Sequence, residues 1–255
     1  MIICRSPAEI ERLRRSGKMA RGLLEELRER AQPGVSTWEL EKYIEGRIAQ
    51  LGARSAFKGY RGYPCCLCAS VNSEVIHGIP SQRRLKTGDI LGLDLGVVLD
   101  GYYGDSAITV PVGEIPESAQ RLLRVTQEAL RLAIDQARLG NRLGDISATV
   151  QRHVEENGYS VVREFVGHGI GRQLHEEPQI PNFGQPGHGP VLKQGMVLAI
   201  EPMVNAGGAA VRVLADNWTA VTADGALSAH FEHMVAVSRN GPDILTLPES
   251  TVGST

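Results

Sequence analysis

The chain has 255 residues, of which 42% are hydrophobic and 22% are charged, and its formal net charge is −2. This balance gives no electrostatic indication of a nucleic-acid site, and no run of about 18 apolar residues predicts a membrane span. The first residues lack an apolar signal segment, and three of the four cysteines lie within residues 65–68, so we expect a cytoplasmic protein with reduced thiols.

Two helices are predicted in the first part of the chain. Ser6–Glu9 is typical of a helix N-terminus, and apolar residues recur at helical spacing as far as about Arg30. A break at Gly34 follows, and Ser36–Glu39 begins a second helix that ends near Gly52. Arginines on the outer face of the first helix indicate a solvated surface; the alternative is a basic surface for a ribosome or another acidic partner.

Residues 53–75 are predicted to be mixed turn and strand, and they contain the cysteine cluster. Cys65 and Cys68 have the spacing of half a zinc ribbon, but the chain has no second Cys-x-x-Cys pair. We therefore favour buried thiols, or a thiol in a pocket, over a zinc site.

Residues 88–110 are predicted to form a β-hairpin in which one strand carries Asp94 and the other Asp105. If the chain turns just before Asp100, the two carboxylates lie directly opposite each other. If Asp100 and Gly101 form a two-residue loop, the carboxylates are diagonal neighbours. Either register places both on the same face of the hairpin.

The same face of the hairpin carries Gly92 and Gly96, which leave room above the sheet, whereas Leu91, Leu93 and Leu95 on the other face require a core. Neighbouring carboxylates repel each other unless a proton or a cation lies between them. We therefore predict a metal site on this face. The alternative is a pair of solvated residues at a sheet edge.

The second half of the chain is predicted to contain two helices and several strands. The helices run from about Pro116 to Leu139 and from about Asp145 to Gly158, and strands lie near residues 196–201, 209–222 and 230–237. After Asn240 the sequence predicts only a surface strand or loop.

A glycine-rich motif, Gly167–Pro178, contains His168 and His175. Its glycines favour a loop or a strand end and allow the backbone to approach a ligand closely. We predict His168 as a metal ligand. Four other histidines are interpreted as structural or surface residues: His153, His188, His230 and His233. Of these, His233 is expected to face away from the Glu232 side of its strand.

The two halves of the chain form an internal repeat. Leu85–Asp94 aligns with Leu192–Glu201, and further on Asp105 aligns with Glu232. Each half therefore contains two helices and a hairpin with two acidic residues. A pseudo-twofold axis would bring the four carboxylates to the inner face of one curved antiparallel sheet backed by helices, an α+β fold.

Four carboxylates in one pocket cannot all stay ionised without cations. Two divalent ions, about 3.5–4 Å apart with a water or hydroxide between them as the nucleophile, would remove the repulsion. One imidazole is a common additional ligand, and His168 is the candidate.

Several motifs of the chain, in this order and at these separations, resemble the type I methionine aminopeptidases, which have the pita-bread fold. These motifs are His77-Gly-Ile-Pro, Asp94, Asp105, His168-Gly-Ile-Gly-x-x-Leu-His175-Glu, Ala199-Ile-Glu201-Pro and Phe231-Glu232-His233. The resemblance covers nearly the whole chain. It implies one catalytic domain, 1–255, with internal halves of about 1–114 and 115–255. The implied activity is removal of the initiator methionine from nascent chains when the second residue is small, by hydroxide attack at a dinuclear metal centre.

The resemblance also implies the metal ligands. Asp94 would bind one ion, Asp105 and Glu232 would bridge both ions, and His168 and Glu201 would complete the second. Mn, Fe, Co and Zn all suit such oxygen-rich ligation with one imidazole.

Three residues take catalytic roles by the same resemblance. Glu201 would be the general base, His175 would donate to the oxygen of the tetrahedral intermediate, and His77 would contact the substrate near the scissile amide.

The resemblance implies a methionine pocket and a monovalent-cation site. The pocket residues are Tyr60, Tyr63, Cys68, His77, Leu174 and Trp218, and the Na⁺ or K⁺ site matches the segments of Asn72, Glu74 and Ser228. Leu174 stands where the family usually has Phe, and Phe57 where it usually has Cys. The alternative for aromatic residues such as Trp218 is a place in the core.

The implied partners are peptides and nascent chains that begin with methionine, and the ribosome surface is a further partner. The implied state is a monomer that binds no membrane and no nucleic acid. Two other enzymes of this fold are alternatives: a proline-specific aminopeptidase or dipeptidase, which usually carries an added N-terminal domain, and a metal-free creatine hydrolase, which would have lost several acids. The non-enzymatic alternative is a pita-bread binding protein, for which a broken ligand set and basic extensions are expected.

Overall fold

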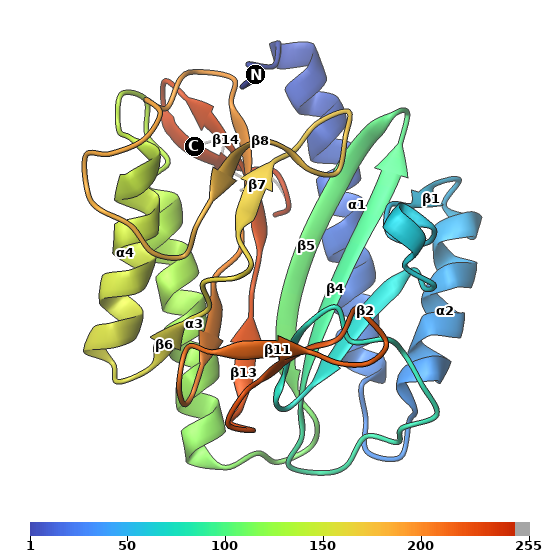
Figure 1. Cartoon of the computed structure of the whole chain (residues 1–255). Coiled ribbons are helices and arrows are strands. Elements are labelled where there is room, and N and C mark those ends of the chain that lie inside the picture. Colours follow the sequence, from blue (N-terminus) through green and yellow to red (C-terminus); the bar gives the residue numbers. More distant parts are fainter. Residues whose placement is uncertain (248–255) are drawn as a thin grey trace, which may run out of the picture.

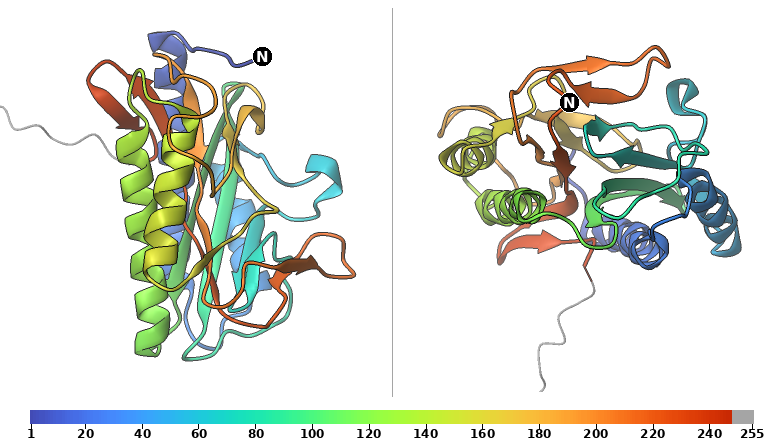
Figure 2. Two further views of the ribbon diagram at one scale, coloured as in Figure 1. Left: turned by 60° about the vertical axis from the view of Figure 1, so that its left-hand side comes forward. Right: turned by 90° about the horizontal axis from the view of Figure 1, so that it is seen from below.

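The computed structural model describes residues 1–247, and its four α-helices lie side by side along one face of a layer of strands (Figures 1 and 2). The helices are α1 (Pro7–Arg30), α2 (Thr37–Gln50), α3 (Glu117–Gln136) and α4 (Leu143–Glu156). They lie where the sequence predicts them, although α3 ends earlier and α4 begins earlier than expected.

Both predicted helix caps of the first half are present. The Ser6 side chain accepts a hydrogen bond from the Glu9 backbone N–H, and the Glu9 carboxylate accepts one from the Ser6 backbone N–H. Ser36 and Glu39 form the same reciprocal pair at the start of α2. These bonds satisfy backbone donors that have no partner inside the helix, and so fix where each helix begins.

The first half of the chain contributes a four-stranded antiparallel sheet. It consists of β1 (Arg54–Ser55), β2 (Leu67–Val71), β4 (Ile90–Leu99) and β5 (Tyr102–Pro111), with β4 paired to all three other strands. Leu99 pairs with Tyr102, so Asp100 and Gly101 form the two-residue loop, and Asp94 and Asp105 are diagonal neighbours. The positive φ angles of the two loop residues, 52° and 77°, suit a tight hairpin turn.

The two faces of β4 differ as predicted. Leu91, Leu93 and Leu95 are completely buried in the core, against which α1 packs. On the opposite face, the space above Gly96 is filled, because a Cβ atom there would lie 2.6 Å from the Phe57 ring. The expectation of free space above this glycine was therefore wrong, and the packing of Phe57 supplies the reason.

The second half contributes a five-stranded sheet in the order β15-β14-β9-β7-β8. Its strands are β7 (Gly167–Gly169), β8 (Glu176–Ile180), β9 (Val197–Ile200), β14 (His233–Ser238) and β15 (Gly241–Ile244). The last of these is the surface strand expected after Asn240. Residues 248–255, at the end of that predicted tail, lie outside the described residues.

The fold also contains two three-stranded sheets. Two of the predicted strands differ from the strands observed here. One sheet contains β6 (Ser160–Val161), β10 (Met203–Asn205) and β13 (Ser228–His230), and the other contains β3 (Glu74–Ile76), β11 (Val211–Val213) and β12 (Ala220–Thr222). The predicted strand at 209–222 is a hairpin, β11–β12. The predicted strand at 230–237 is divided, because the chain leaves one sheet at His230 and enters another at His233.

The two halves meet along β5. The backbone N–H of Glu232 donates to the carbonyl of Ala107 at 2.9 Å, and the Ser106 hydroxyl donates to the Glu232 carbonyl at 3.0 Å. Further along β5, the Thr109 hydroxyl donates to the carbonyl of His230 at 2.9 Å. This seam places the acidic residues of the two halves next to each other.

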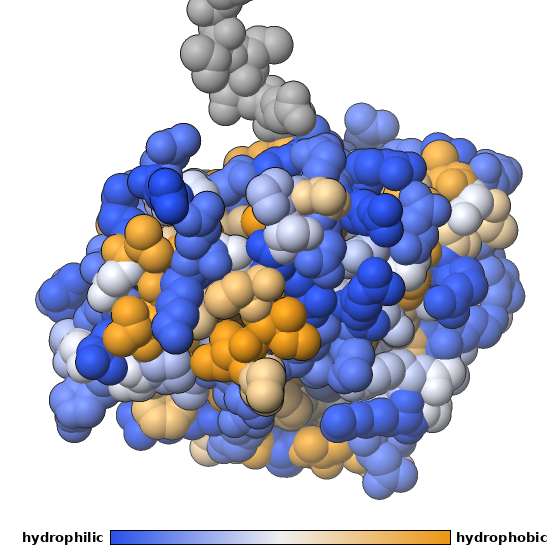
Figure 3. All heavy atoms as spheres, turned by 90° about the horizontal axis from the view of Figure 1, so that it is seen from above, coloured by the Kyte–Doolittle hydropathy of each residue, from blue (hydrophilic) through white to orange (hydrophobic). Residues whose placement is uncertain are grey.

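The surface at the end of the molecule where the N-terminus lies is largely hydrophilic, with several apolar areas, the most extensive of them near its middle (Figure 3). Among residues 1–247, no helix is both long and apolar enough to span a bilayer.

Candidate metal centre and active site

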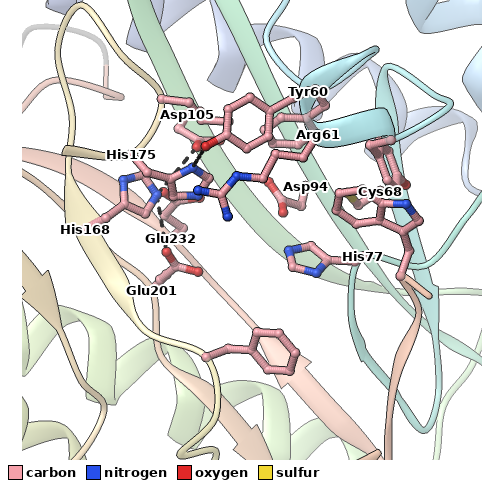
Figure 4. Close-up of a pocket in the computed structure, with 15 residues that line it drawn as sticks. Tyr60, Arg61, Cys68, His77, Asp94, Asp105, His168, His175, Glu201 and Glu232 are labelled. Carbon is pink, nitrogen blue, oxygen red and sulfur yellow. Dashed lines mark hydrogen bonds and ion pairs between the residues drawn. The ribbon is translucent and has the colours of Figure 1, made fainter. Parts of the chain in front are cut away.

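Four carboxylates converge on the inner face of the strands (Figure 4). Asp94 comes from β4 and Asp105 from β5, while Glu201 directly follows β9 and Glu232 directly precedes β14. Asp105 and Glu232 are buried, and Asp94 and Glu201 are partly buried. The structure thus brings together the four acids that the sequence repeat predicted.

His168, at the centre of β7, completes this cluster. Its Nε2 atom lies 3.5 Å from Glu201 Oε1 and 3.9 Å from Asp105 Oδ2. Potential ligand atoms of Asp105, His168 and Glu232 all lie within 4.8 Å of one another. The backbone of Gly167 runs so close to β9 that a Cβ atom would lie 2.5 Å from the Ala199 carbonyl oxygen. The glycine before His168 therefore allows this histidine to reach the cluster.

Three oxygens of the cluster are buried and accept no hydrogen bond from the described residues: Asp94 Oδ1, Asp105 Oδ1 and Glu232 Oε1. Buried polar atoms normally have partners, and a buried carboxylate oxygen without a donor is a natural cation ligand. The donor set of carboxylates and one imidazole fits the divalent ions that the sequence predicted.

The electrostatics of the cluster agree with this fit. Burial raises the pKa of Asp94 to about 7 and the pKa of Glu201 to about 8. Burial and neighbouring carboxylates raise the pKa of Asp105 and of Glu232 well above their usual values. These side chains repel one another when ionised, so they retain protons that a bound cation would displace.

The histidines around the cluster are neutral at physiological pH. Burial lowers the pKa of His77 to about 4, and burial together with nearby His175 lowers that of His168 to about 3. His175 stands at the mouth of the cavity, where the surrounding protein and the Arg61 guanidinium lower its pKa to about 4. A neutral imidazole has one nitrogen free to bind a metal and one N–H free to donate.

His175 and His77 lie on opposite sides of the cavity (Figure 4). The centres of the His175 and His168 rings are 4.3 Å apart. The Nδ1 atom of His175 is 2.8 Å from the Tyr60 hydroxyl oxygen. The His77 ring packs edge-on against Phe165 and Trp218, at 5.5 and 6.0 Å between ring centres.

A cavity of about 260 Å³ joins the cluster to an apolar wall. Every site residue that the sequence predicted for the metals, the catalysis or the methionine pocket lines it. The apolar wall comprises Phe57, Tyr60, Tyr63, Cys68, Phe165, Leu174 and Trp218. Cys68 and its neighbours Cys65 and Cys66 are buried free thiols, as expected. Trp218 and Tyr63 meet edge to face at 5.1 Å, so these aromatics form a wall of the cavity.

The predicted monovalent-cation segments are close in space, since the Ser228 N–H donates to the Asn72 carbonyl at 2.9 Å. The Glu74 carboxylate accepts from the Val71 N–H at 2.7 Å. The cation itself stays a prediction.

Sequence reasoning missed three residues of the site. Arg61 and Phe165 line the cavity, and nothing in a single sequence distinguishes them from surface or core residues. His230 was interpreted as a structural or surface residue, yet its Nε2 atom lies 3.4 Å from Glu201 Oε2. Its position two residues before Glu232 was the available signal, because alternate residues of an extended chain share a face.

The remaining histidines lie away from the cluster. His233 faces the other side of its strand, where its Nδ1 atom lies 2.7 Å from the Thr246 hydroxyl. His153 lies 3.3 Å from Glu128, and His188 is exposed.

The fold and site define a class of protein. Residues 11–239 match the family model of metallopeptidase family M24, and the chain belongs to this family. It is similar to a methionine aminopeptidase of Clostridium perfringens, at 53% identity over 97% of this chain and 99% of that protein. It is 52% identical to methionine aminopeptidase 1 of Bacillus subtilis, over 96% of this chain and 99% of the relative.

Solved structures give the same result. The crystal structure of methionine aminopeptidase from Thermotoga maritima superposes with a TM-score of 0.95 at 48% identity, covering 97% of this chain and all of that one. A prolidase from Pyrococcus furiosus shares the fold, with a TM-score of 0.79 at 24% identity, but this chain covers only 66% of it. The predicted pita-bread fold is therefore confirmed.

Proposed function

We propose that this chain is a metal-dependent methionine aminopeptidase, which removes the initiator methionine from nascent proteins when the second residue is small. The observation that carries the proposal is one arrangement: unpaired buried carboxylate oxygens and His168 beside an aromatic cavity of about 260 Å³. Relatives that are 42–53% identical over nearly their whole length and are named methionine aminopeptidases support the same activity.

Five side chains would hold two divalent cations. These side chains are Asp94, Asp105, His168, Glu201 and Glu232. When bound, such ions supply Lewis acidity for the scissile carbonyl and activation of the attacking water. Mn, Fe, Co and Zn are the candidates, and a Na⁺ or K⁺ ion near Asn72, Glu74 and Ser228 belongs to the same proposal.

Three side chains carry the proton transfers and orientation. Glu201 takes the proton of the attacking water. Its Oε1 atom lies 3.5 Å from His168 Nε2, and its Oε2 atom lies 3.4 Å from His230 Nε2. His175, neutral at pH 7, donates its free N–H to the oxygen that becomes negative in the transition state. His77, on the other side of the cavity, contacts the substrate near the scissile amide.

Substrate selection follows from the cavity. The methionine side chain packs against Tyr60, Tyr63, Cys68, Leu174 and Trp218, because a thioether makes favourable contacts with aromatic rings. Leu174 stands where the family usually has Phe, so the shape of this pocket should differ from that of the family. We place the activity in the cytoplasm, where nascent chains are met, and propose a monomer that acts near the ribosome.

The test is an assay of purified, metal-stripped protein with each divalent ion added back. We expect release of methionine from Met-Ala-Ser and no release of alanine from an Ala-Pro peptide. The opposite pattern would favour the proline-specific aminopeptidase, and no release with any ion would favour the non-catalytic binding protein.

A further inference from the structure

A second hollow adjoins the active-site cavity along the strand β8. It has a volume of about 610 Å³, and three residues line both spaces: Arg61, His168 and His175. Its other walls include Glu177 on β8 and Met1 at the N-terminus. This inference rests on the proposed function. When the methionine side chain lies in the apolar cavity and the scissile bond lies beside His175, the residues that follow the methionine extend through the second hollow.

Arg61 lies at the junction of the two spaces, on a well-fixed turn. Its φ angle of 48° is in the left-handed region, which a non-glycine residue adopts only where the surroundings hold it. The Gly59 N–H donates to the Tyr63 carbonyl at 2.8 Å, which closes the turn. The neighbouring Tyr60 hydroxyl is bonded to His175 across the mouth. The Arg61 side chain extends over the mouth toward His175 (Figure 4).

Arg61 is exposed and, among residues 1–247, forms no ion pair with a carboxylate. Its guanidinium carbon Cζ lies 5.4 Å from the centre of the Tyr60 ring. Glu176 in the same hollow differs, because it pairs with Arg5 and accepts the backbone N–H of Arg172. A planar guanidinium held on a fixed turn and facing an open hollow is suited to bind a carboxylate in two parallel hydrogen bonds.

We propose that Arg61 forms a binding subsite for a carboxylate on the part of the substrate that follows the scissile bond. Either the side chain of an acidic third residue or the C-terminal carboxylate of a short peptide supplies this group. Arg61 is thus a specificity-determining residue, and it favours acidic over neutral third residues by about fivefold in kcat/KM, the contribution of one solvent-exposed ion pair.

The experiment compares blocked substrates that differ only in charge. Met-Ala-Asp-Gly-amide and Met-Ala-Asn-Gly-amide have nearly the same shape, so their ratio of kcat/KM isolates the carboxylate. We expect a ratio of about five that falls as salt is added, because salt screens exposed charges. R61K, which keeps the charge but not the planar pair of donors, should keep only part of the ratio, R61Q should bring it to one, and R61E should bring it below one.

Arg172 provides the matched control. Its backbone N–H donates to Glu176, which lines the second hollow, but Arg172 itself lines neither hollow, and its guanidinium donates to the Tyr102 hydroxyl at 2.8 Å. R172Q removes the same charge and should leave the Asp/Asn ratio at its original value. Comparing Met-Ala-Gly as the free acid with its amide separates a terminal carboxylate from a side-chain one.

The outcomes distinguish this inference from the proposed function. Release of methionine with an Asp/Asn ratio near one and no gain for the free acid would overturn the subsite, and so would a ratio that R61Q leaves unchanged. Failure to release methionine from any peptide, with every ion added, would instead overturn the proposed function.

Discussion

The two halves of the molecule deliver their acidic residues in different ways. In the first half, two ten-residue strands joined by a two-residue turn carry Asp94 and Asp105 within one rigid hairpin. In the second half, Glu201 and Glu232 lie just outside the short strands β9 and β14, and the chain between them forms the separate hairpin β11–β12. The repeated strands that carry the four acids (the frame) supply the cluster. Residues 202–231, the longer stretch between the two acids of the second half (the insertion), add Trp218 to the cavity wall.

This difference separates two tasks. Side chains on the repeated frame are expected to control chemistry and metal affinity, whereas side chains on the insertion are expected to control substrate binding. Substitutions in each region should therefore change different kinetic parameters.

Glu201→Gln in the frame should have the largest effect. The amide cannot take a proton from water, and a positioned general base contributes about 10²–10⁴-fold to rate. We expect kcat for a Met-Ala-Ser peptide to fall by about that factor while the circular dichroism spectrum is unchanged. A kcat close to that of the unmodified protein would remove Glu201 from the base role.

His175→Ala should slow the chemical step by about 10²–10³-fold, as loss of one donor to a developing oxyanion does. The change should appear in kcat measured under single-turnover conditions. His188→Ala is the control, because His188 is exposed and outside the cavity, and it should leave kcat as it was. Equal rates for the two variants would contradict the role of His175.

Trp218→Ala in the insertion should raise KM about tenfold, the value of losing an aromatic contact, with a smaller change in kcat. Metal affinity measured by calorimetry should stay constant, because Trp218 lies on the aromatic wall and not in the carboxylate cluster. A large loss of metal affinity would show that frame and insertion are not separate.

The contacts between helices also differ between the two halves, and a substitution there should have the smallest effect. Hydrogen bonds from Arg47 and Tyr43 lower the pKa of Glu26 to about 2, joining α1 to α2, whereas α3 and α4 are linked by His153 and the exposed Glu128. A lowered pKa stabilises the folded state above pH 4.5, and this stabilisation is lost as pH falls toward 2.

Glu26→Gln should accordingly lower the melting temperature by about 1–3 °C at pH 7, because the pair is partly exposed. The gap between the two proteins should close between pH 4.5 and pH 2, where the Glu26 carboxylate gains its proton. A gap that widens toward low pH would have the wrong sign.

Local patterns were sufficient to predict the four helices, the caps of α1 and α2, and the hairpin β4–β5. The alternation of Leu91, Gly92, Leu93 and Asp94 sets both faces of that strand, and Asp100-Gly101 is a strong turn signal. The repeat extended this reasoning to the second half and so predicted the carboxylate cluster, whereas His168 was predicted from its glycine-rich motif.

Features that depend on distant contacts could not be predicted in this way. The strand change after His230 is set by pairing with residues far away in the chain. The filling of space above Gly96 by Phe57 likewise depends on packing between segments. The hairpin at 209–222 is a different case, since Asp216 and Asn217 are turn residues whose signal was available.

The account depends on the carboxylate cluster holding a pair of divalent cations. The most direct measurement is anomalous X-ray diffraction from crystals of the metal-stripped protein soaked in Mn²⁺. We predict two anomalous peaks among Asp94, Asp105, His168, Glu201 and Glu232. Peaks found only elsewhere on the protein, or no peak at saturating Mn²⁺, would contradict the account.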